Sequence, residues 1–281
     1  MNKIKRSWVL TKASLNVLKH DNELIVFPII SAVMMVVITL TFLIPTLVGN
    51  FLDQIINTGI PFFGYVVLFL FYLVQYFVVY FMSTALVGAA MIRLRGGNPT
   101  LKDGFQIALH RISPILGWSL VSATVGVILK MLSNQSKEKG RGLASILSSL
   151  LGAAWSVLTF LVVPVIAVEG LGPIEAVKRS WELLKRSWGE QIVGTMSIGL
   201  IFLLIGLAGG GVLVNIGVGL FILLDNVWPV AIIGILLVML IMILSLLSTT
   251  LNGIFSASVY AYASEGRVGL IEERLLQNAF D

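Results

Sequence analysis

Residues 172–188 read GPIEAVKRSWELLKRSW, and this stretch predicts how the rest of the chain is organised. At about 100° per residue on a helix, its apolar side chains share one arc and its charged side chains occupy the adjoining arc. The apolar arc consists of Ile174, Val177, Trp181, Leu184 and Trp188. A basic amphipathic helix with Trp on its apolar side is typical of a segment lying in the plane of a membrane surface. A long apolar run follows, so we expect this helix to lead the chain into a bilayer.

The composition supports a membrane protein. The 281 residues are 57% hydrophobic and 12% charged, with a mean hydropathy of +0.98. Soluble domains carry about a quarter charged residues. Several apolar runs reach the ~20 residues that a helix needs to cross a bilayer. The short alternating segments of transmembrane strands are absent. The sequence therefore predicts an all-α, polytopic membrane protein.

Six apolar runs predict six transmembrane helices, at residues 24–48, 61–92, 114–132, 143–168, 190–208 and 227–263. The first run is too long for the core of a signal peptide, so we expect it to be retained as a span. We also expect Asn252-Gly253 to bend the sixth span, because this apolar run is longer than a bilayer requires.

An amphipathic helix precedes each pair of spans, at residues 4–19, 101–111 and 173–188. Thr100 and Asp103 have the spacing of a capping box that opens the second of these helices. The order of surface helix, span, outer turn, span and glycine thus occurs three times. We interpret the chain as one membrane domain, 1–281, of three repeat-like hairpins (4–97, 100–170 and 173–266) and a tail, 267–281.

Three consecutive glycines, Gly209–Gly211, interrupt the fifth apolar run and predict a break there. The piece that follows, Val212–Leu224, is too short to cross a bilayer alone. Two interpretations stay open for it. It can re-enter the membrane as a half-helix with Asn215 as a ligand, or it can skim the outer surface as a connection hinged by glycine.

The basic residues predict the orientation. The net charge is +5, and most of the 19 Lys and Arg residues fall on the side of the layout that holds both termini. The positive-inside rule places that side in the cytoplasm. We therefore expect a multi-pass protein of the cell (inner) membrane, and no nucleic-acid partner. The four exceptions all lie in the turn between spans 3 and 4: Lys130, Lys137, Lys139 and Arg141.

Short motifs carry a resemblance to a known family. They are RSWVLTKA at 6–13, LVVPVIAVEG at 161–170, GPIEA at 172–176 and KRSW at 178–181. This pattern resembles uncharacterised prokaryotic six-span membrane proteins, akin to the membrane domain attached to some glycerophosphodiester phosphodiesterases. The resemblance implies a fold and a membrane location. It transfers no catalytic residue, because the chain has no soluble phosphodiesterase domain.

Polar side chains form a stripe on each even-numbered span. Since polar groups avoid lipid, we expect these faces to turn toward protein or a wet cavity. Two interpretations stay open: a polar pathway between helices 2, 4 and 6, or helix packing through small residues and hydroxyl hydrogen bonds. The candidate residues are Tyr72, Tyr76, Tyr80, Ser83, Ser149, Ser156, Thr159, Ser245, Ser248, Thr249 and Asn252.

The basic surface helices offer a second kind of site. A Lys or Arg near an anionic membrane surface gains about 1 kcal/mol of attraction. We therefore expect contacts with anionic lipids of the cytoplasmic leaflet from Lys12, Lys178, Arg179, Lys185 and Arg186.

Motifs for catalysis are absent from the sequence. It holds no P-loop, no H-E-x-x-H and no nucleophile elbow, and with zero Cys it has no thiolate site. His20 and His110 stand apart, without the neighbours that a metal site needs. A membrane enzyme would need a charged cluster at one interface, toward which only Glu169 points. We expect no catalysis and no cofactor.

Two functions fit these observations. The first is a non-catalytic membrane module that binds lipid or a membrane protein partner, with self-association into a homo-oligomer as a further expectation. The alternative is a channel or passive transporter for ions or small solutes that uses the polar stripes.

Overall fold

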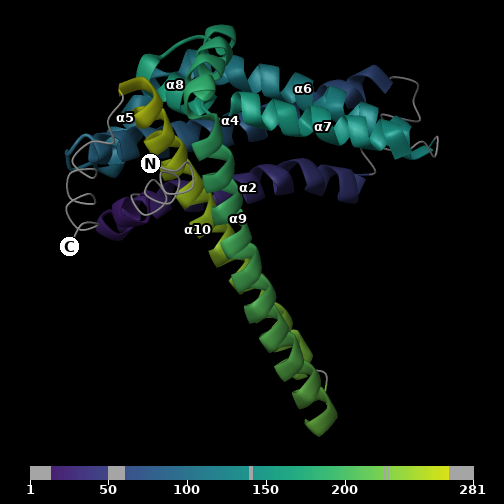
Figure 1. Ribbon diagram of the computed structural model, residues 1–281. Coiled ribbons are helices and arrows are strands. Elements are labelled where there is room, and N and C mark those ends of the chain that lie inside the picture. The colour runs from purple at the N-terminus through teal and green to yellow at the C-terminus, as the bar shows by residue number, and fades with distance from the viewer. Residues whose placement is uncertain (1–13, 50–60, 139–141, 225, 227, 266–281) are drawn as a thin grey trace, which may run out of the picture.

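The described part of the chain is helical throughout. A computed structural model describes residues 14–49, 61–138, 142–224, 226 and 228–265 (Figure 1). Residues 14–20 are helical and lead into η1 (Asn22–Ile25). The α-helices that follow are α2 (Val26–Gly49), α4 (Pro61–Leu94), α5 (Leu101–His110), α6 (Ile112–Glu138), α7 (Gly142–Thr159), α8 (Val162–Glu169), α9 (Pro173–Leu224) and α10 (Trp228–Glu265).

The long helix α4 organises the packing. It contacts α2, α5, α6, α8 and α10, and its residues 84–91 are all buried. Helices α6 and α7 pack along each other, while α9 and α10 pair and extend away from the other helices as a long arm (Figure 1). The hydrophobic core lies where the C-terminal half of α10, from Leu251 to Ala263, meets α4, α5 and α8.

Five described helical segments are long and apolar enough to cross a membrane: Asn22–Ile44, Phe69–Leu94, Leu150–Glu169, Ile198–Leu223 and Trp228–Ser264. The apolar stretch of α6, Ile112–Gly126, is shorter. An all-helical chain with several spanning helices is thus confirmed. The structure supports five of the six expected spans by length and composition.

The surface of the arm is apolar, as contact with lipid requires. Apolar side chains such as Leu204 and Leu207 of α9 and Ile235 and Ile241 of α10 are more than half exposed. Exposed apolar surface is unfavourable in water by about 25 cal/mol per Å². Hydrocarbon removes that penalty, so these faces suit the interior of a bilayer.

The expected break at Gly209–Gly211 is wrong, and with it both interpretations of residues 212–224. Helix α9 runs unbroken from Pro173 to Leu224, so the surface helix of 173–188 and the fifth span are one helix. Each glycine weakens a helix by about 1 kcal/mol in water. In hydrocarbon, however, a broken helix leaves backbone groups unbonded, which is far more unfavourable. Leu240 and Leu237 of α10 lie against Gly209 and Gly210, so these glycines bring two helices close together.

The sixth span is likewise one helix, α10, with Asn252 and Gly253 inside it. Gly253 allows a close approach: a Cβ atom there would lie 2.5 Å from Cδ2 of Leu86 on α4. At the position of the expected bend, the structure has a continuous helix in tight contact with α4.

The fourth span, expected as continuous over 143–168, is divided instead. Helix α7 ends at Thr159 and α8 begins at Val162. Pro164 explains the interruption, because it has no N–H to donate to Phe160 and its ring clashes with the carbonyl four residues earlier. The proline lies in the LVVPVIAVEG motif, so the motif marks a helix break.

Two helix starts form as the sequence predicts. The Thr100 hydroxyl accepts a hydrogen bond from the Asp103 N–H (3.3 Å), and the Asp103 carboxylate accepts one from the Thr100 N–H (2.9 Å). Helix α9 begins at Pro173, and the Glu175 carboxylate accepts a hydrogen bond from the Gly172 N–H (3.1 Å). Residues 4–13 of the first surface helix and the tail 267–281 lie outside the described residues.

Candidate functional site

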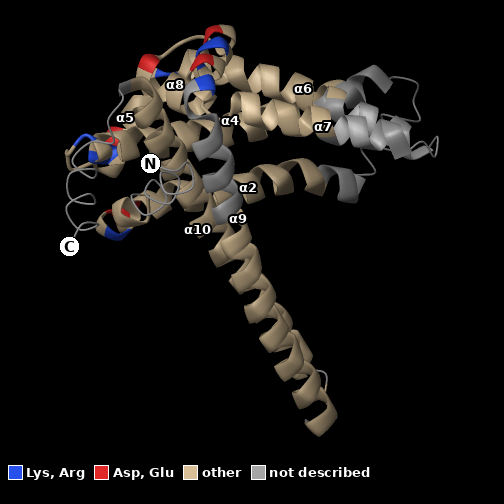
Figure 2. Cartoon of the chain, in the orientation of Figure 1, with Lys and Arg blue, Asp and Glu red and all other residues tan. Residues whose placement is uncertain are grey.

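Where the structure describes side chains, the charged ones gather at one end of the molecule, which we call the charged end (Figure 2). It comprises α5, α8, the first turns of α9 and the chain around η1. Among the described side chains from Ile198 to Ser264, none is charged. A chain that crosses a bilayer is expected to place charge in this way, because ionisable groups are unfavourable within hydrocarbon.

Glu169 links three helices at the charged end. Its carboxylate accepts hydrogen bonds from Nε of Arg179 on α9, at 3.0 and 3.2 Å, and from the Tyr260 hydroxyl of α10, at 2.8 Å. Arg179 also contacts the Glu182 carboxylate at 3.4 Å. The hydrogen bond to Glu169 raises the pKa of Arg179, which stays a cation. We call Glu169, Arg179 and Tyr260 the Glu169 cluster.

Gly170 ends α8 in a conformation that favours glycine. Its φ is +69°, in the left-handed region, and its N–H bonds to the carbonyls of Val165 and Ile166. A Cβ atom at this position would clash with the guanidinium of Arg111. Nη2 of Arg111 approaches the Val168 carbonyl at 3.5 Å. The guanidinium thus lies over the helix end, where the helix dipole favours a cation.

A second ion pair connects the start of the described chain to α4. Nε and Nη2 of Arg93 form a two-pronged pair with the carboxylate of Asp21, which is 9% exposed. Nη2 also donates to Oδ1 of Asn98 at 2.6 Å. The sequence showed these residues only as boundary charges, and nothing in their spacing across 72 positions predicts the pairing.

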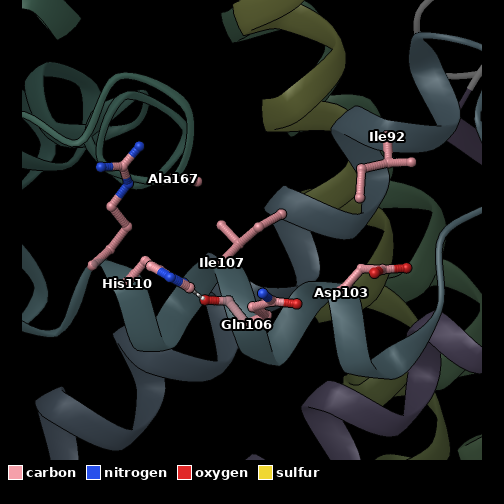
Figure 3. A pocket seen from close by; sticks show the side chains of 7 residues that line it. Ile92, Asp103, Gln106, Ile107, His110 and Ala167 are labelled. Carbon is pink, nitrogen blue, oxygen red and sulfur yellow. Dashed lines mark hydrogen bonds between the residues drawn. The ribbon is translucent and has the colours of Figure 1, made fainter.

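A pocket of about 430 Å³ opens at the charged end between α4, α5 and α8 (Figure 3). Gln106 and His110 lie side by side on α5, and Asp103 lies at the other end of that helix (Figure 3). His110 Nδ1 is 2.7 Å from the backbone carbonyl oxygen of Gln106. Because this oxygen can only accept, Nδ1 donates the hydrogen bond. The lining residues are Ile92, Asp103, Gln106, Ile107, His110, Arg111 and Ala167.

Asp103 predicts a pH-dependent stability of α5. The Thr100 hydroxyl and backbone N–H hold the pKa of this carboxyl below its ordinary value. A depressed pKa stabilises the fold above the ordinary carboxyl range and loses that effect as the pH falls through the folded-state value. We expect Asp103→Asn to lower the Tm near pH 6, with a deficit that shrinks toward pH 3. Differential scanning fluorimetry in detergent measures it, with Glu23→Gln as the control; a deficit independent of pH would contradict the assignment.

Of the residues expected to contact lipid, two lysines are exposed, whereas Arg179 is paired with an acidic side chain. Lys178 and Lys185 are exposed, and Nζ of Lys185 lies 5.2 Å from the centre of the Trp181 ring. Arg179 instead points its guanidinium at Glu169. Lys12 and the side chain of Arg186 lie outside the described residues.

Two tyrosines of the stripe on α4, Tyr76 and Tyr80, turn toward α6. The rings of Tyr76 and Tyr80 are stacked at 5.9 Å, and Tyr80 contacts Trp118 of α6 at 6.0 Å. Trp118 in turn stacks on Trp155 of α7 at 5.8 Å. Tyr72 lies against its neighbour Phe71 at 5.5 Å. These contacts form an aromatic column across α4, α6 and α7, in which the tyrosines pack against protein.

Other stripe residues line a larger cavity of about 620 Å³ between α2, α4 and α10, closed at one side by the junction of α7 and α8. It includes four of the predicted residues, Ser83, Ser245, Thr249 and Asn252. We call it the α2–α10 cavity. The structure thus brings together the stripes of the second and sixth spans and adds α2 to them.

The described stripe residues of the fourth span, Ser156 and Thr159, do not line this cavity. Ser156 is exposed on α7, and the Thr159 hydroxyl donates to the carbonyl of Trp155 at 2.8 Å. The side chain of Ser149 lies outside the described residues. On α10, the carbonyl and hydroxyl of Ser248 accept hydrogen bonds from Asn252. A pathway shared by all three spans stays a prediction.

Comparison with known families gives one result. A family model described as a family of unknown function (DUF6159) matches residues 62–270, the region from α4 through α10. No curated protein matches the chain. The match agrees with the expected uncharacterised family and shows no link to glycerophosphodiester phosphodiesterases.

Proposed function

Since the chain belongs to the DUF6159 family of unknown function, we propose that it is a non-catalytic integral membrane module that binds anionic lipid at its charged end. The observation that carries the proposal is on the first turns of α9, where apolar and basic side chains are exposed together, next to the exposed carboxylates of Glu175 and Glu182. Ile174 is 70% exposed and Trp181 39%, beside the exposed Lys178 and Lys185.

The headgroup layer suits both kinds of side chain. A Trp ring prefers the boundary between water and hydrocarbon, where its apolar body and its N–H are both accommodated. The ammonium group of Lys185 lies over the Trp181 ring, so one lysine and the ring occupy the same depth. Each of the two lysines then gains about 1 kcal/mol from a negatively charged leaflet.

The proposal includes a complete layout in the membrane. Helix α6 supplies the third of the six expected spans, its polar end protruding from the bilayer. The charged end faces the cytoplasm, as do both termini, and the membrane is the cell (inner) membrane. The concentration of the described Lys and Arg residues at one end supports this orientation through the positive-inside rule (Figure 2). The four exceptions, Lys130, Lys137, Lys139 and Arg141, lie outside the described side chains.

The double variant Lys178→Gln/Lys185→Gln tests lipid binding. In the delipidated, detergent-solubilised protein, we expect dissociation constants for dioleoylphosphatidylglycerol, measured by native mass spectrometry, to rise about tenfold or more, since two favourable charges are lost. Binding of dioleoylphosphatidylcholine should change little. The fold is expected to persist, because both lysines are exposed.

The matched control is Lys19→Gln/Lys102→Gln, which removes two exposed lysines at the same end but away from Trp181. It should retain most of the preference for phosphatidylglycerol. An equal loss in both double variants would reduce the effect to net charge, and an unchanged preference in the first would refute the proposal.

A further inference from the structure

The α2–α10 cavity has a polar lining without charge. Hydroxyl groups enter it from three helices, and an amide completes the set: Ser31 on α2, Ser83 on α4, and Ser245, Thr249, Asn252 and Ser256 on α10. Met35, Met82 and Leu86 are among the apolar residues that complete its walls. None of its lining residues is ionisable. A ligand that fits this lining is therefore uncharged and combines an apolar body with a hydrogen-bonding group.

The Asn252 amide determines whether the ligand donates or accepts a hydrogen bond at this position. Its nitrogen donates to the Ser248 carbonyl at 2.9 Å. A carbonyl can only accept, so the amide cannot be turned the other way round. Its Oδ1 is buried and has no hydrogen-bond partner within the described part of the chain. A buried acceptor left unpaired is unfavourable by about 1–3 kcal/mol, so this atom calls for a donor.

The depth of the cavity excludes a charged headgroup. Asn252 precedes Tyr260 by eight residues on α10, which corresponds to about 12 Å along the helix at ~1.5 Å per residue. Tyr260 bonds to Glu169 at the charged end. The orphan acceptor therefore lies well inside the apolar zone, where an ionised group is strongly unfavourable.

The helices that flank the cavity face lipid elsewhere on their surfaces. Val33 and Val36 of α2 are each 58% exposed, and Met242 of α10 is 55% exposed. The cavity itself is partly open, so apolar molecules dissolved in the bilayer can reach it. Its volume of about 620 Å³ falls in the range of small-molecule sites, which hold about 300–1,000 Å³.

We propose that the α2–α10 cavity binds a neutral lipid with a free hydroxyl group, of the diacylglycerol type. The ligand hydroxyl exchanges hydrogen bonds with the serine and threonine hydroxyls around it, and a small shift of Asn252 on binding opens its buried Oδ1 to the same hydroxyl. The acyl part lies along Met35, Met82 and Leu86. Without a charged headgroup, such a lipid places its hydroxyl at this depth at little desolvation penalty.

Photolabelling of the full-length protein in phosphatidylcholine nanodiscs tests the site. The probe is 1,2-dioleoylglycerol with a diazirine in one acyl chain, and unlabelled 1,2-dioleoylglycerol is the competitor. We expect labelled peptides from α2, α4 and α10, and competition that weakens about tenfold when the competitor's hydroxyl is methylated. In Asn252→Leu, the competitor concentration needed for half displacement should rise about tenfold, as the loss of one buried hydrogen bond predicts.

The chain supplies a matched control in Asn215→Leu. Asn215 also bonds through its side-chain nitrogen to the carbonyl four residues earlier, that of Gly211 at 2.7 Å, but it is exposed on α9 and does not line the cavity. This variant should compete like the wild type. If Asn252→Leu does not fold, Ser83→Leu and Thr249→Leu fill the cavity from two helices and should abolish specific labelling.

Three outcomes would overturn the proposal. They are labelling that the unlabelled lipid does not displace, displacement that the methylated competitor matches, and labelled peptides confined to residues 198–223 of α9. Unchanged competition in the folded Asn252→Leu, or in both filling variants, would do the same.

Discussion

Replacing Glu169 by alanine is expected to lower the free energy of unfolding by about 2–3 kcal/mol. The carboxylate accepts two hydrogen bonds from Arg179 and one from Tyr260, and it thereby joins α8, α9 and α10. Losing one partner of a fully buried pair destabilises a protein by about 3–5 kcal/mol. Because the side chains of Glu169 and Arg179 are 23% and 33% exposed, solvent screening reduces that figure.

The comparison with Glu182→Ala makes this test specific. Glu182 contacts the same guanidinium at 3.4 Å, but its side chain is 63% exposed, so its removal should change stability by less than about 0.5 kcal/mol. Tyr260→Phe should fall between them, near 1 kcal/mol, the usual contribution of one hydrogen bond. Unfolding by SDS titration in mixed micelles measures all three. Equal effects of Glu169→Ala and Glu182→Ala would show that the Glu169 cluster does not join the helices.

Local signals in the sequence were enough to predict particular helix starts. The spacing of Thr100 and Asp103 predicts the capping box at α5, because both hydrogen bonds of that motif form within four residues. Pro173 predicts the start of α9 in the same way, since a proline at the first position lacks only an N–H that the helix does not use. Each depends on backbone chemistry within one turn, which the sequence specifies directly.

One interruption, at Gly209–Gly211, was predicted where the helix is continuous, because the rules for water and for hydrocarbon differ. Gly209–Gly211 would weaken a soluble helix, yet α9 continues through them. Hydrocarbon offers no other partner to the backbone, so glycine there brings α10 closer without ending the helix. Pro164 lacks the N–H altogether, and one turn before it the helix does break, between α7 and α8.

The candidate sites were predictable only as faces of single helices. The polar stripe of α4 points in two directions in the structure: Tyr80 packs on Trp118 of α6, whereas Ser83 lines the α2–α10 cavity. Which neighbour a face meets depends on contacts between distant parts of the chain. The pairing of Glu169 with Tyr260, 91 residues apart, has the same origin and leaves no pattern along the sequence.

Gly104→Ala is expected to be as damaging as the loss of Glu169, with a decrease of about 2–3 kcal/mol in the free energy of unfolding. Gly104 is buried on α5, where a Cβ atom would lie 2.5 Å from Cζ of Phe27 and 2.8 Å from the carbonyl oxygen of Ala85. The Phe27 ring is fully buried and packed against Phe105, so it has little room to move. The Ala85 oxygen belongs to the backbone of α4, so relief requires α5 to shift. Overpacking of a rigid core destabilises by about 1–3 kcal/mol.

Gly199→Ala separates this packing effect from helix propensity. Gly199 lies within α9, and a Cβ atom there has nothing within 4 Å. Alanine favours a helix over glycine by up to about 1 kcal/mol in water, so this variant should be neutral or slightly more stable. The same SDS titration compares the two, and limited proteolysis of the 95–100 connection reports whether α5 has moved. If Gly104→Ala were as stable as Gly199→Ala, α5 would have room to shift, and α5 could not be a rigid wall of the pocket at the charged end.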